Sequence, residues 1–300
     1  MMRAAPSAVL FVAFGCSGTP TEESSRPSST ESTARLEFSP DVPPSEDEAY
    51  LCYGFDVSPI LGGYVRGVRW TLPDGGVALH HAKLWVTKEV LPTTATPFSC
   101  DPVPPDETGI HLWVLGGSEL ELPPDTGLAL PEDARTIVVE AHAVRVSDAP
   151  AAIASVAVRF DSARPARVAR HLGLDAPVPA IRPETRERSA TRCRFDAAFH
   201  AFQSLPHMHR VGAEFVATHQ GPAAEETFLH VDPWDFEAQV TYPTLVDFEP
   251  GDAVWFECIW ENPTASYVLP GNYSKDEMCT FGLVGWPASA ATCVPEEIAP

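Results

Sequence analysis

The chain has 300 residues, of which 44% are hydrophobic and 20% are charged. This length suits one large domain or two moderate ones, with enough residues to bury a core. The 41 acidic residues outnumber the 20 Lys and Arg and give a net charge of −21. That balance argues against nucleic acid or an anionic membrane surface as a partner, because both require a basic patch.

The first residues have the pattern of a targeting segment. Arg3 precedes a short apolar run that ends in small residues and Cys16, and this run is too short to span a bilayer stably. The stretch "AFGC" resembles a bacterial lipobox, in which the cysteine is lipidated and becomes the first mature residue. We therefore expect residues 1–16 to be a signal peptide that ends in the lipidation site Cys16. Ordinary secretion is the alternative that this motif leaves open.

Residues 17–46 are rich in Ser, Thr, Pro and Glu. Such a segment can bury little apolar surface, so we expect it to be a disordered tether. A tether behind a lipidated cysteine would hold a folded domain off a membrane. The protein is therefore expected to be exported and lipid-anchored in the bacterial cell envelope, and the lipid anchor is its only predicted membrane contact.

The remaining chain has the pattern of an all-β protein. Short stretches rich in β-branched and aromatic residues predict strands at 79–87, 135–144, 153–160, 213–219 and 253–260. Turn sequences such as "PDGG" and "EPGD" separate them. Antiparallel β-sandwich is the predicted architecture. The Pro-rich, charged stretch 171–190 predicts a join between two sandwiches, at 47–170 and 171–300.

The cysteines agree with export. Apart from Cys16 there are six, which is an even number and implies disulfides in an exported chain. Six cysteines allow 15 connectivities, so the residues alone do not choose among them. No CxxC motif occurs, and a thiolate zinc site is therefore not predicted.

Several of the ten histidines have spacings that suit a metal site. In a strand, His207 and His209 share one face, and Met208 points to the other. His80 and His81 are adjacent, so joint ligation requires a β-bulge or a strand end. His142 shares a strand face with Glu140. A strand histidine is also commonly a half-buried residue with an ordinary partner, and that interpretation stays open for each.

Three histidines would suit zinc, copper or iron, whereas an added thioether favours Cu(I). Only two methionines lie outside the initiator region. Met208 is on the wrong face to join its neighbouring histidines, which leaves Met278 as the candidate sulfur ligand. It lies in the polar stretch "YSKDEMC", next to Cys279, which a disulfide could hold in place.

The order of five motifs is similar to that of a known family. "YLC" (50–52), "HH" (80–81), "VEAH" (139–142), "HMH" (207–209) and "DEMC" (276–279) resemble the copper type II, ascorbate-dependent monooxygenases. The likeness extends over roughly residues 48–293, and its specificity lies in the order of the motifs. It implies two jelly-roll antiparallel β-sandwich domains that face each other across an open, copper-binding cleft.

The resemblance also implies two copper ions per chain. One, held by His80, His81 and His142, would store and pass on an electron. The other, held by the catalytic residues His207, His209 and Met278, would bind O2 and host C–H hydroxylation. Ascorbate or another one-electron reductant would supply electrons, and His200 and Glu140 would lie in the outer shell. The implied disulfides are Cys52–Cys100, Cys193–Cys293 and Cys258–Cys279.

Three positions depart from the family pattern. Leu205 stands where the peptidylglycine enzyme has an arginine that anchors the substrate carboxylate, and Thr280 and Gly282 replace two residues that assist it. A leucine cannot make the charge-assisted pair that an arginine gives a carboxylate. We therefore expect a small-molecule or peptide substrate that is not a peptide C-terminal glycine. The residues carry no signal for an oligomer.

Other function classes remain open at this point. A copper-binding or copper-sequestering surface lipoprotein would bind the metal without turnover. A zinc hydrolase on a β-sandwich would need a general base near three histidines, for which Glu140 is the candidate, and would leave Met278 without a role. A purely structural surface protein is the remaining possibility.

Overall fold

The computed structural model describes residues 31–72, 76–94, 96–100, 107–114, 119–222 and 224–296. Every regular element in these ranges is a β-strand, so the predicted all-β class is confirmed. The expected signal peptide and the expected lipidation site Cys16 lie outside the described residues. Within those ranges, no helix has the length and hydropathy that crossing a membrane requires.

The described residues form 18 strands in three sheets. The strands are β1 (Ser32–Phe38), β2 (Glu48–Asp56), β3 (Tyr64–Thr71), β4 (Val77–Thr87), β5 (Thr108–Val114), β6 (Leu120–Glu121), β7 (Thr126–Ala129), β8 (Thr136–Arg145), β9 (Ala154–Asp161), β10 (Arg167–Asp175), β11 (Thr185–Phe195), β12 (Phe199–His207), β13 (Gly212–Gln220), β14 (Glu225–Val231), β15 (Tyr242–Phe248), β16 (Ala253–Asn262), β17 (Thr280–Trp286) and β18 (Ala291–Glu296). All five stretches predicted as strands are strands, in β4, β8, β9, β13 and β16.

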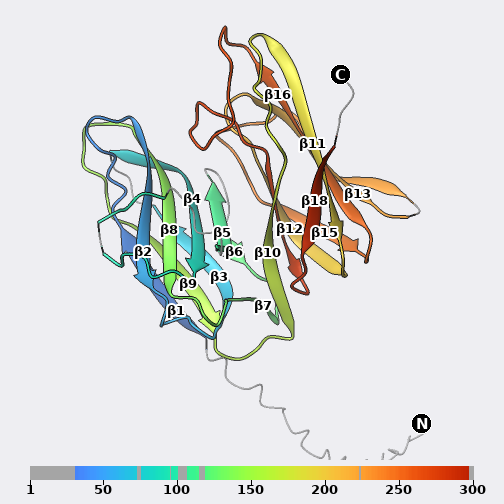
Figure 1. The fold of residues 1–300 in the computed structure, drawn as a ribbon. Coiled ribbons are helices and arrows are strands. Elements are labelled where there is room, and N and C mark those ends of the chain that lie inside the picture. The colour runs from blue at the N-terminus through green and yellow to red at the C-terminus, as the bar shows by residue number, and fades with distance from the viewer. Residues whose placement is uncertain are drawn as a thin grey trace, which may run out of the picture.

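One large sheet runs through both halves of the protein. Its order is β1-β9-β3-β7-β10-β17-β12-β15, and β6 pairs with β3. A four-stranded sheet, β2-β8-β4-β5, lies in the N-terminal half, and a five-stranded sheet, β14-β13-β16-β11-β18, lies in the C-terminal half (Figure 1). Strand β10 is the junction, because it pairs in parallel with β7 and antiparallel with β17.

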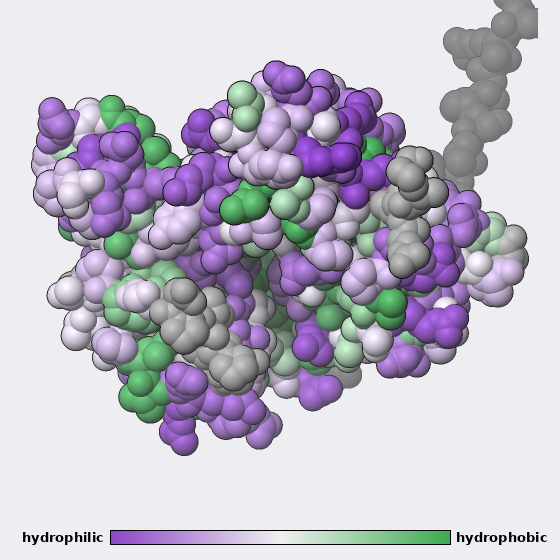
Figure 2. Space-filling model, turned by 45° about the horizontal axis from the view of Figure 1, so that its top comes forward, coloured by the Kyte–Doolittle hydropathy of each residue, from purple (hydrophilic) through white to green (hydrophobic). Residues whose placement is uncertain are grey.

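Two hydrophobic cores lie on either side of this junction. The first draws its buried side chains from Leu36 to Ala169, with Val284 added. The second draws them from Leu172 to Leu283. Each core is filled by residues that alternate along strands of facing sheets, as in a β-sandwich. The surface outside them is mostly hydrophilic, with small separate hydrophobic areas on the face that Figure 2 shows.

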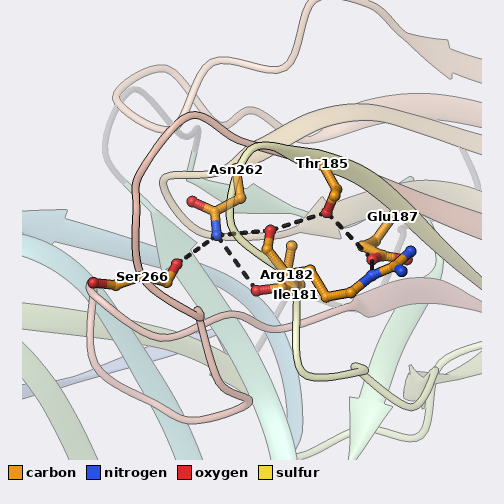
Figure 3. A network of polar contacts seen from close by, with 6 residues as sticks. All are labelled: Ile181, Arg182, Thr185, Glu187, Asn262 and Ser266. Atoms are coloured by element: carbon orange, nitrogen blue, oxygen red, sulfur yellow. Dashed lines mark hydrogen bonds and ion pairs between the residues drawn. The ribbon is translucent and has the colours of Figure 1, made fainter.

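The expected join at 171–190 is mostly regular structure. It contains the second half of β10 and the first half of β11, and only residues 176–184 connect the two. Asn262 of β16 holds this connection, because its side-chain amide donates to the carbonyl oxygens of Ile181, Arg182 and Ser266 at 3.3, 3.1 and 2.8 Å (Figure 3). The Pro-rich, charged stretch 171–190 is therefore a connection fixed by hydrogen bonds and not a free linker.

The prediction that residues 17–46 form a disordered tether is wrong for its described part, 31–46. Strand β1 pairs along its whole length with β9. Leu36 and Phe38 are buried in the first core, whereas Arg35 and Glu37, which alternate with them, are exposed. This alternation is short and sits in a polar stretch. Its partner strand lies about 120 residues further along the chain, so local composition could not reveal the pairing.

We expect Phe38→Ala to destabilise the protein by about 3 kcal/mol, because it removes a buried ring and leaves a cavity. Urea unfolding measures this change. Arg35→Ala, on the exposed face of the same strand, is the matched control and should change the unfolding free energy by less than about 0.5 kcal/mol. Equal effects of the two variants would show that β1 does not contribute to the core.

Three disulfides are present among the described residues. They join Cys52 to Cys100, Cys193 to Cys293, and Cys258 to Cys279, which are the pairs that the family resemblance implies. Disulfides persist in oxidising compartments, so they indicate an exported protein.

Candidate metal centre

The adjacent histidines lie at a β-bulge in β4. The pairing of β4 with β8 shifts between Leu79 and His81, which sets His81 directly opposite His142 and leaves His80 as the extra residue. A bulge re-aims a side chain that would otherwise point to the opposite face of the sheet. All three imidazoles are buried, and one ring nitrogen from each lies within 4.8 Å of the others. The geometry that joint ligation requires is therefore present.

The ring nitrogens of this group fit a metal. Both nitrogens of His80, and Nδ1 of His81 and His142, are buried without a hydrogen-bond partner among the described residues. A buried polar atom without a partner costs about 1–3 kcal/mol. Several such atoms converging on one point are explained by a shared ion. Imidazole nitrogen is a preferred ligand of copper and zinc.

Burial keeps these imidazoles in the neutral form that binds metals. It lowers the pKa of His80 to about 4 and the pKa of His81 well below its ordinary value, and the neighbouring histidines add to both effects. For His142, burial lowers the pKa although Glu48 opposes the shift. A neutral ring presents a lone pair to a metal without first losing a proton.

Glu48 of β2 orients His142. Its Oε2 lies 2.8 Å from His142 Nε2, and the Tyr50 ring stacks on the imidazole with centroids 4.3 Å apart. Since an ionised carboxylate only accepts, His142 Nε2–H donates and Nδ1 carries the lone pair. A carboxylate behind a ligand histidine is a frequent feature of metal sites.

We call His80, His81 and His142 the first set of candidate ligands, and His207, His209 and Met278 the second set. The second set begins with His207 at the end of β12. His207 Nδ1 lies 2.7 Å from Gln239 Oε1, and the Gln239 amide nitrogen donates to Phe236 O at 3.1 Å. The second bond fixes the amide so that Oε1 faces the histidine. His207 therefore donates from Nδ1 and keeps the Nε2 lone pair for a metal.

His209 is held in a similar way. Its Nδ1 lies 3.1 Å from the carbonyl oxygen of Asp276, and its Nε2 is buried without a partner in the described structure. Burial lowers the pKa of His207 to about 3 and of His209 to about 4. Met208 between them lies in the second core with no exposed area. The prediction that it points away from the two histidines is confirmed.

A cavity of about 630 Å³ lies between the two halves. His81, His207, Met278 and Thr280 line it together with residues of β5 and β10. The candidate sulfur ligand Met278 therefore lines the same cavity as His81 and His207.

The two sets of histidines are adjacent, and the expectation of two jelly-roll domains that face each other across a copper-binding cleft stays a prediction. The rings of His81 and His207 have centroids 5.6 Å apart, and His80 stacks on Phe236 at 4.1 Å. Glu48 also accepts a hydrogen bond from Ser274 Oγ at 2.6 Å. These contacts join the two halves at the candidate ligands, beside the cavity.

His200 does not lie at the site, and the outer-shell role expected for it is wrong. It is the second residue of β12, seven residues before His207, which is roughly 20 Å along a strand. Its half-exposed ring bonds Asp247 Oδ1 through Nδ1 at 2.6 Å and tilts against Trp286. His200 and His207 belong to the same strand, and an extended chain places residues seven positions apart far from each other.

Glu140 lies on β8 opposite Lys83, two residues before His142. Burial raises the pKa of its carboxyl group, while Lys83 lowers it. Among the described residues the carboxylate bonded to His142 is Glu48, which sequence reasoning missed. It also missed Gln239 and Glu277, which contact the second set. Only Glu277 carried a sequence signal, as part of "DEMC".

His111 of β5 is a further buried histidine that sequence reasoning missed. Trp70 Nε1 donates to its Nδ1 at 3.0 Å, and its Nε2 is buried without a partner in the described part of the chain. Burial and the nearby His171 lower the pKa of His111 to about 3.

We expect the metal-free protein to lose stability as the pH falls from about 6.5 to 4. Unfolded histidines bind protons below about pH 6.5, whereas folded His111 stays neutral until about pH 3, so the unfolded state gains more protons. Urea unfolding at pH 7 and pH 4.5 measures the loss. His111→Phe isolates this residue, because its loss between the two pH values should be smaller than that of the unchanged protein. An identical loss in both would contradict the assignment.

Comparison with known proteins adds a family match. Residues 170–298 match the family model described as copper type II ascorbate-dependent monooxygenase, C-terminal domain. Among solved structures, a chain of "Structure of infectious bursal disease virus Gx strain" is 10% identical with a TM-score of 0.20, over 89% of this chain and 78% of that chain. A likeness this low carries no argument about fold or function.

Proposed function

The C-terminal part of this chain belongs to the copper type II ascorbate-dependent monooxygenase family, and on that premise we propose that the whole protein is a copper-dependent monooxygenase. It hydroxylates a C–H bond of its substrate with O2 and a one-electron reductant such as ascorbate. The observation that carries the proposal is the group of three buried imidazoles, His80, His81 and His142, whose ligand nitrogens lie within 4.8 Å of one another and include unpartnered ones. This group lies beside the cavity that His81 lines together with His207 and Met278.

The ligands divide into two sets in this proposal. His80, His81 and His142 hold one copper, and His207, His209 and Met278 hold the other. Copper, when bound, supplies the one-electron chemistry and the activation of O2 that no protein side chain provides. A thioether in the second set favours the reduced ion.

The chain's own residues prepare both sets. Glu48 and Gln239 each accept a hydrogen bond from a ring N–H, of His142 and His207 respectively, and so aim the opposite ring nitrogen at the metal. Phe236 covers His80, which limits the access of water to the first set. The cavity beside Met278 gives the substrate a place next to the second set.

The substrate differs from a peptide C-terminal glycine. Leu205 is buried and lies opposite Gly282 in the pairing of β12 with β17. It is two residues before His207, which lies opposite Thr280, so the two pairs share one face of the sheet. Thr280 donates to Asp175 Oδ1 at 2.9 Å. These residues place no cation where the peptidylglycine enzyme binds a carboxylate, so we propose a small-molecule or peptide substrate held by other groups.

A substrate screen tests the proposed activity. Copper-loaded protein is incubated with ascorbate, O2 and a panel of amines, peptides and small apolar molecules, and products are examined for a mass gain of one oxygen. Ascorbate-dependent oxygen uptake with such a product supports the monooxygenase. Tight binding of copper with no oxygen uptake on any substrate would favour a copper-sequestering protein instead.

We also propose that Cys16 is lipidated and anchors the protein in the bacterial cell envelope. The lipobox-like "AFGC" motif supports this, and the disulfides fit an oxidising compartment. Cys16→Ser should move the expressed protein from the detergent phase to the aqueous phase on phase separation. An unchanged partition would rule out the anchor.

A further inference from the structure

Glu277 is a buried carboxylate next to the candidate ligand Met278. Its side chain is 1% exposed. Four N–H groups donate to it: Val211 N to Oε1 at 2.8 Å, and His209 N, Trp260 Nε1 and Met278 N to Oε2 at 2.9, 3.0 and 3.2 Å. Two of these donors are the backbone nitrogens of residues in the second ligand set.

One oxygen atom therefore joins two ligand residues that lie far apart in the sequence. His209 and Glu277 are separated by 68 positions. Since His209 N and Met278 N lie 2.9 and 3.2 Å from the same Oε2, the two nitrogens cannot be more than about 6.1 Å apart. The carboxylate thus sets an upper limit on the separation of the two backbones from which the ligand side chains extend.

The segment around Met278 is anchored on both sides to β16. Trp260 of that strand donates to Glu277, and Cys258 of the same strand forms the disulfide with Cys279. The Glu277 backbone N–H also donates to Leu269 O at 2.9 Å. The carboxylate is consequently a fixed point and not a side chain that follows its ligands.

A carboxylate is the one side-chain group that suits four converging donors. Ionised, it accepts only, with two oxygens and about four lone-pair positions. A glutamine of the same shape would turn an NH2 group toward N–H donors and leave at least one of them unpaired. Burial of the charge is unfavourable by itself, and the four hydrogen bonds offset only part of that penalty, because burial still raises the pKa of Glu277 to about 7.

We propose that Glu277 is a positioning residue that holds His209 and Met278 at the separation that a single metal ion requires. The proposal rests on the proposed function, in which these two residues and His207 share one copper. Glu277 acts through the backbones of the ligands and does not itself touch the metal or the substrate.

Glu277→Gln tests the proposal in two measurements. In metal-free protein, hydrogen exchange by mass spectrometry follows the amides of His209, Val211 and Met278, and we expect exchange to accelerate by about 10-fold, equivalent to one lost hydrogen bond. In copper-loaded, reduced protein, X-ray absorption follows the sulfur scatterer from Met278, which we expect to be lost. Glu257→Gln is the matched control, because Glu257 is a buried glutamate of β16 that pairs with Arg188.

Unchanged exchange and a retained sulfur scatterer in Glu277→Gln would overturn the proposal. Glu277→Asp decides the matter if the glutamine variant does not fold. It keeps the charge but shortens the side chain by one methylene, so we expect a folded protein with weakened sulfur scattering, and full retention would overturn the proposal. A lack of sulfur scattering in the unchanged protein would instead contradict the proposed ligand set, and the exchange measurement would still report on Glu277.

Discussion

We expect replacement of Met278 by isoleucine to abolish the proposed hydroxylation and to leave the fold and the first copper in place. This is the expected result because isoleucine fills a similar volume but offers no sulfur to the metal. Met278 is half-buried and lines the cavity with His81 and His207, so the change reaches the centre of the proposed site. We expect product formation to fall by at least about 100-fold, the upper range for losing only an outer partner of a metal ligand.

Product formation per chain and copper bound per chain measure this prediction together. Met208→Leu is the matched control, because Met208 is fully buried in the second core and a volume-conserving change there should cost less than about 1.5 kcal/mol. It should keep both coppers and the activity. Full turnover by Met278→Ile would contradict the assignment of the sulfur ligand.

Replacing His142 by alanine should have the reciprocal effect. His142 is buried directly opposite His81, and Glu48 holds its ring. Without it the first set has two imidazoles left, and we expect copper to be lost from that set with an affinity loss of more than about 100-fold. Hydroxylation should stop, because the proposed reaction needs an electron from this copper, while the sulfur scattering from Met278 remains.

Titration of the reduced protein with Cu(I) measures the stoichiometry, and X-ray absorption identifies the site that remains. His219→Ala is the matched control, because His219 is also a strand histidine that bonds a carboxylate, with its Nε2 2.8 Å from Asp252 Oδ2. It should leave copper binding unchanged. Equal stoichiometry in His142→Ala and the unchanged protein would contradict the two-set arrangement. Saturation of the unchanged protein below two coppers would do the same.

The contact between the two sets bears on both predictions. The rings of His81 and His207 are 5.6 Å apart, so a change in one set lies next to the other. Effects of neighbouring substitutions are commonly not additive. The double variant Met278→Ile, His142→Ala therefore shows directly whether the two sets bind copper independently.

Much of the strand structure could be predicted from local pattern. Stretches such as 79–87 and 253–260 carry β-branched and aromatic residues, and they fold as β4 and β16. The sequence pattern also separated Met208 from His207 and His209, and Met208 lies in the second core, although β12 ends at His207 and strand parity does not extend to His209. Strand β1 was missed, because its two buried residues, Leu36 and Phe38, lie in a polar stretch and depend on a partner far along the chain.

The sequence by itself determined which candidate ligand types this protein has and in which order, because these properties depend on residue identity alone. Only the tertiary structure decided which groups hold those ligands. Glu48, Gln239 and Glu277 come from distant positions and reach the histidines through sheet pairing and loop packing. It also decided that His200 lies far from the site and that the two sets touch. Those outcomes depend on how strands far apart in the chain pair, which no local spacing encodes.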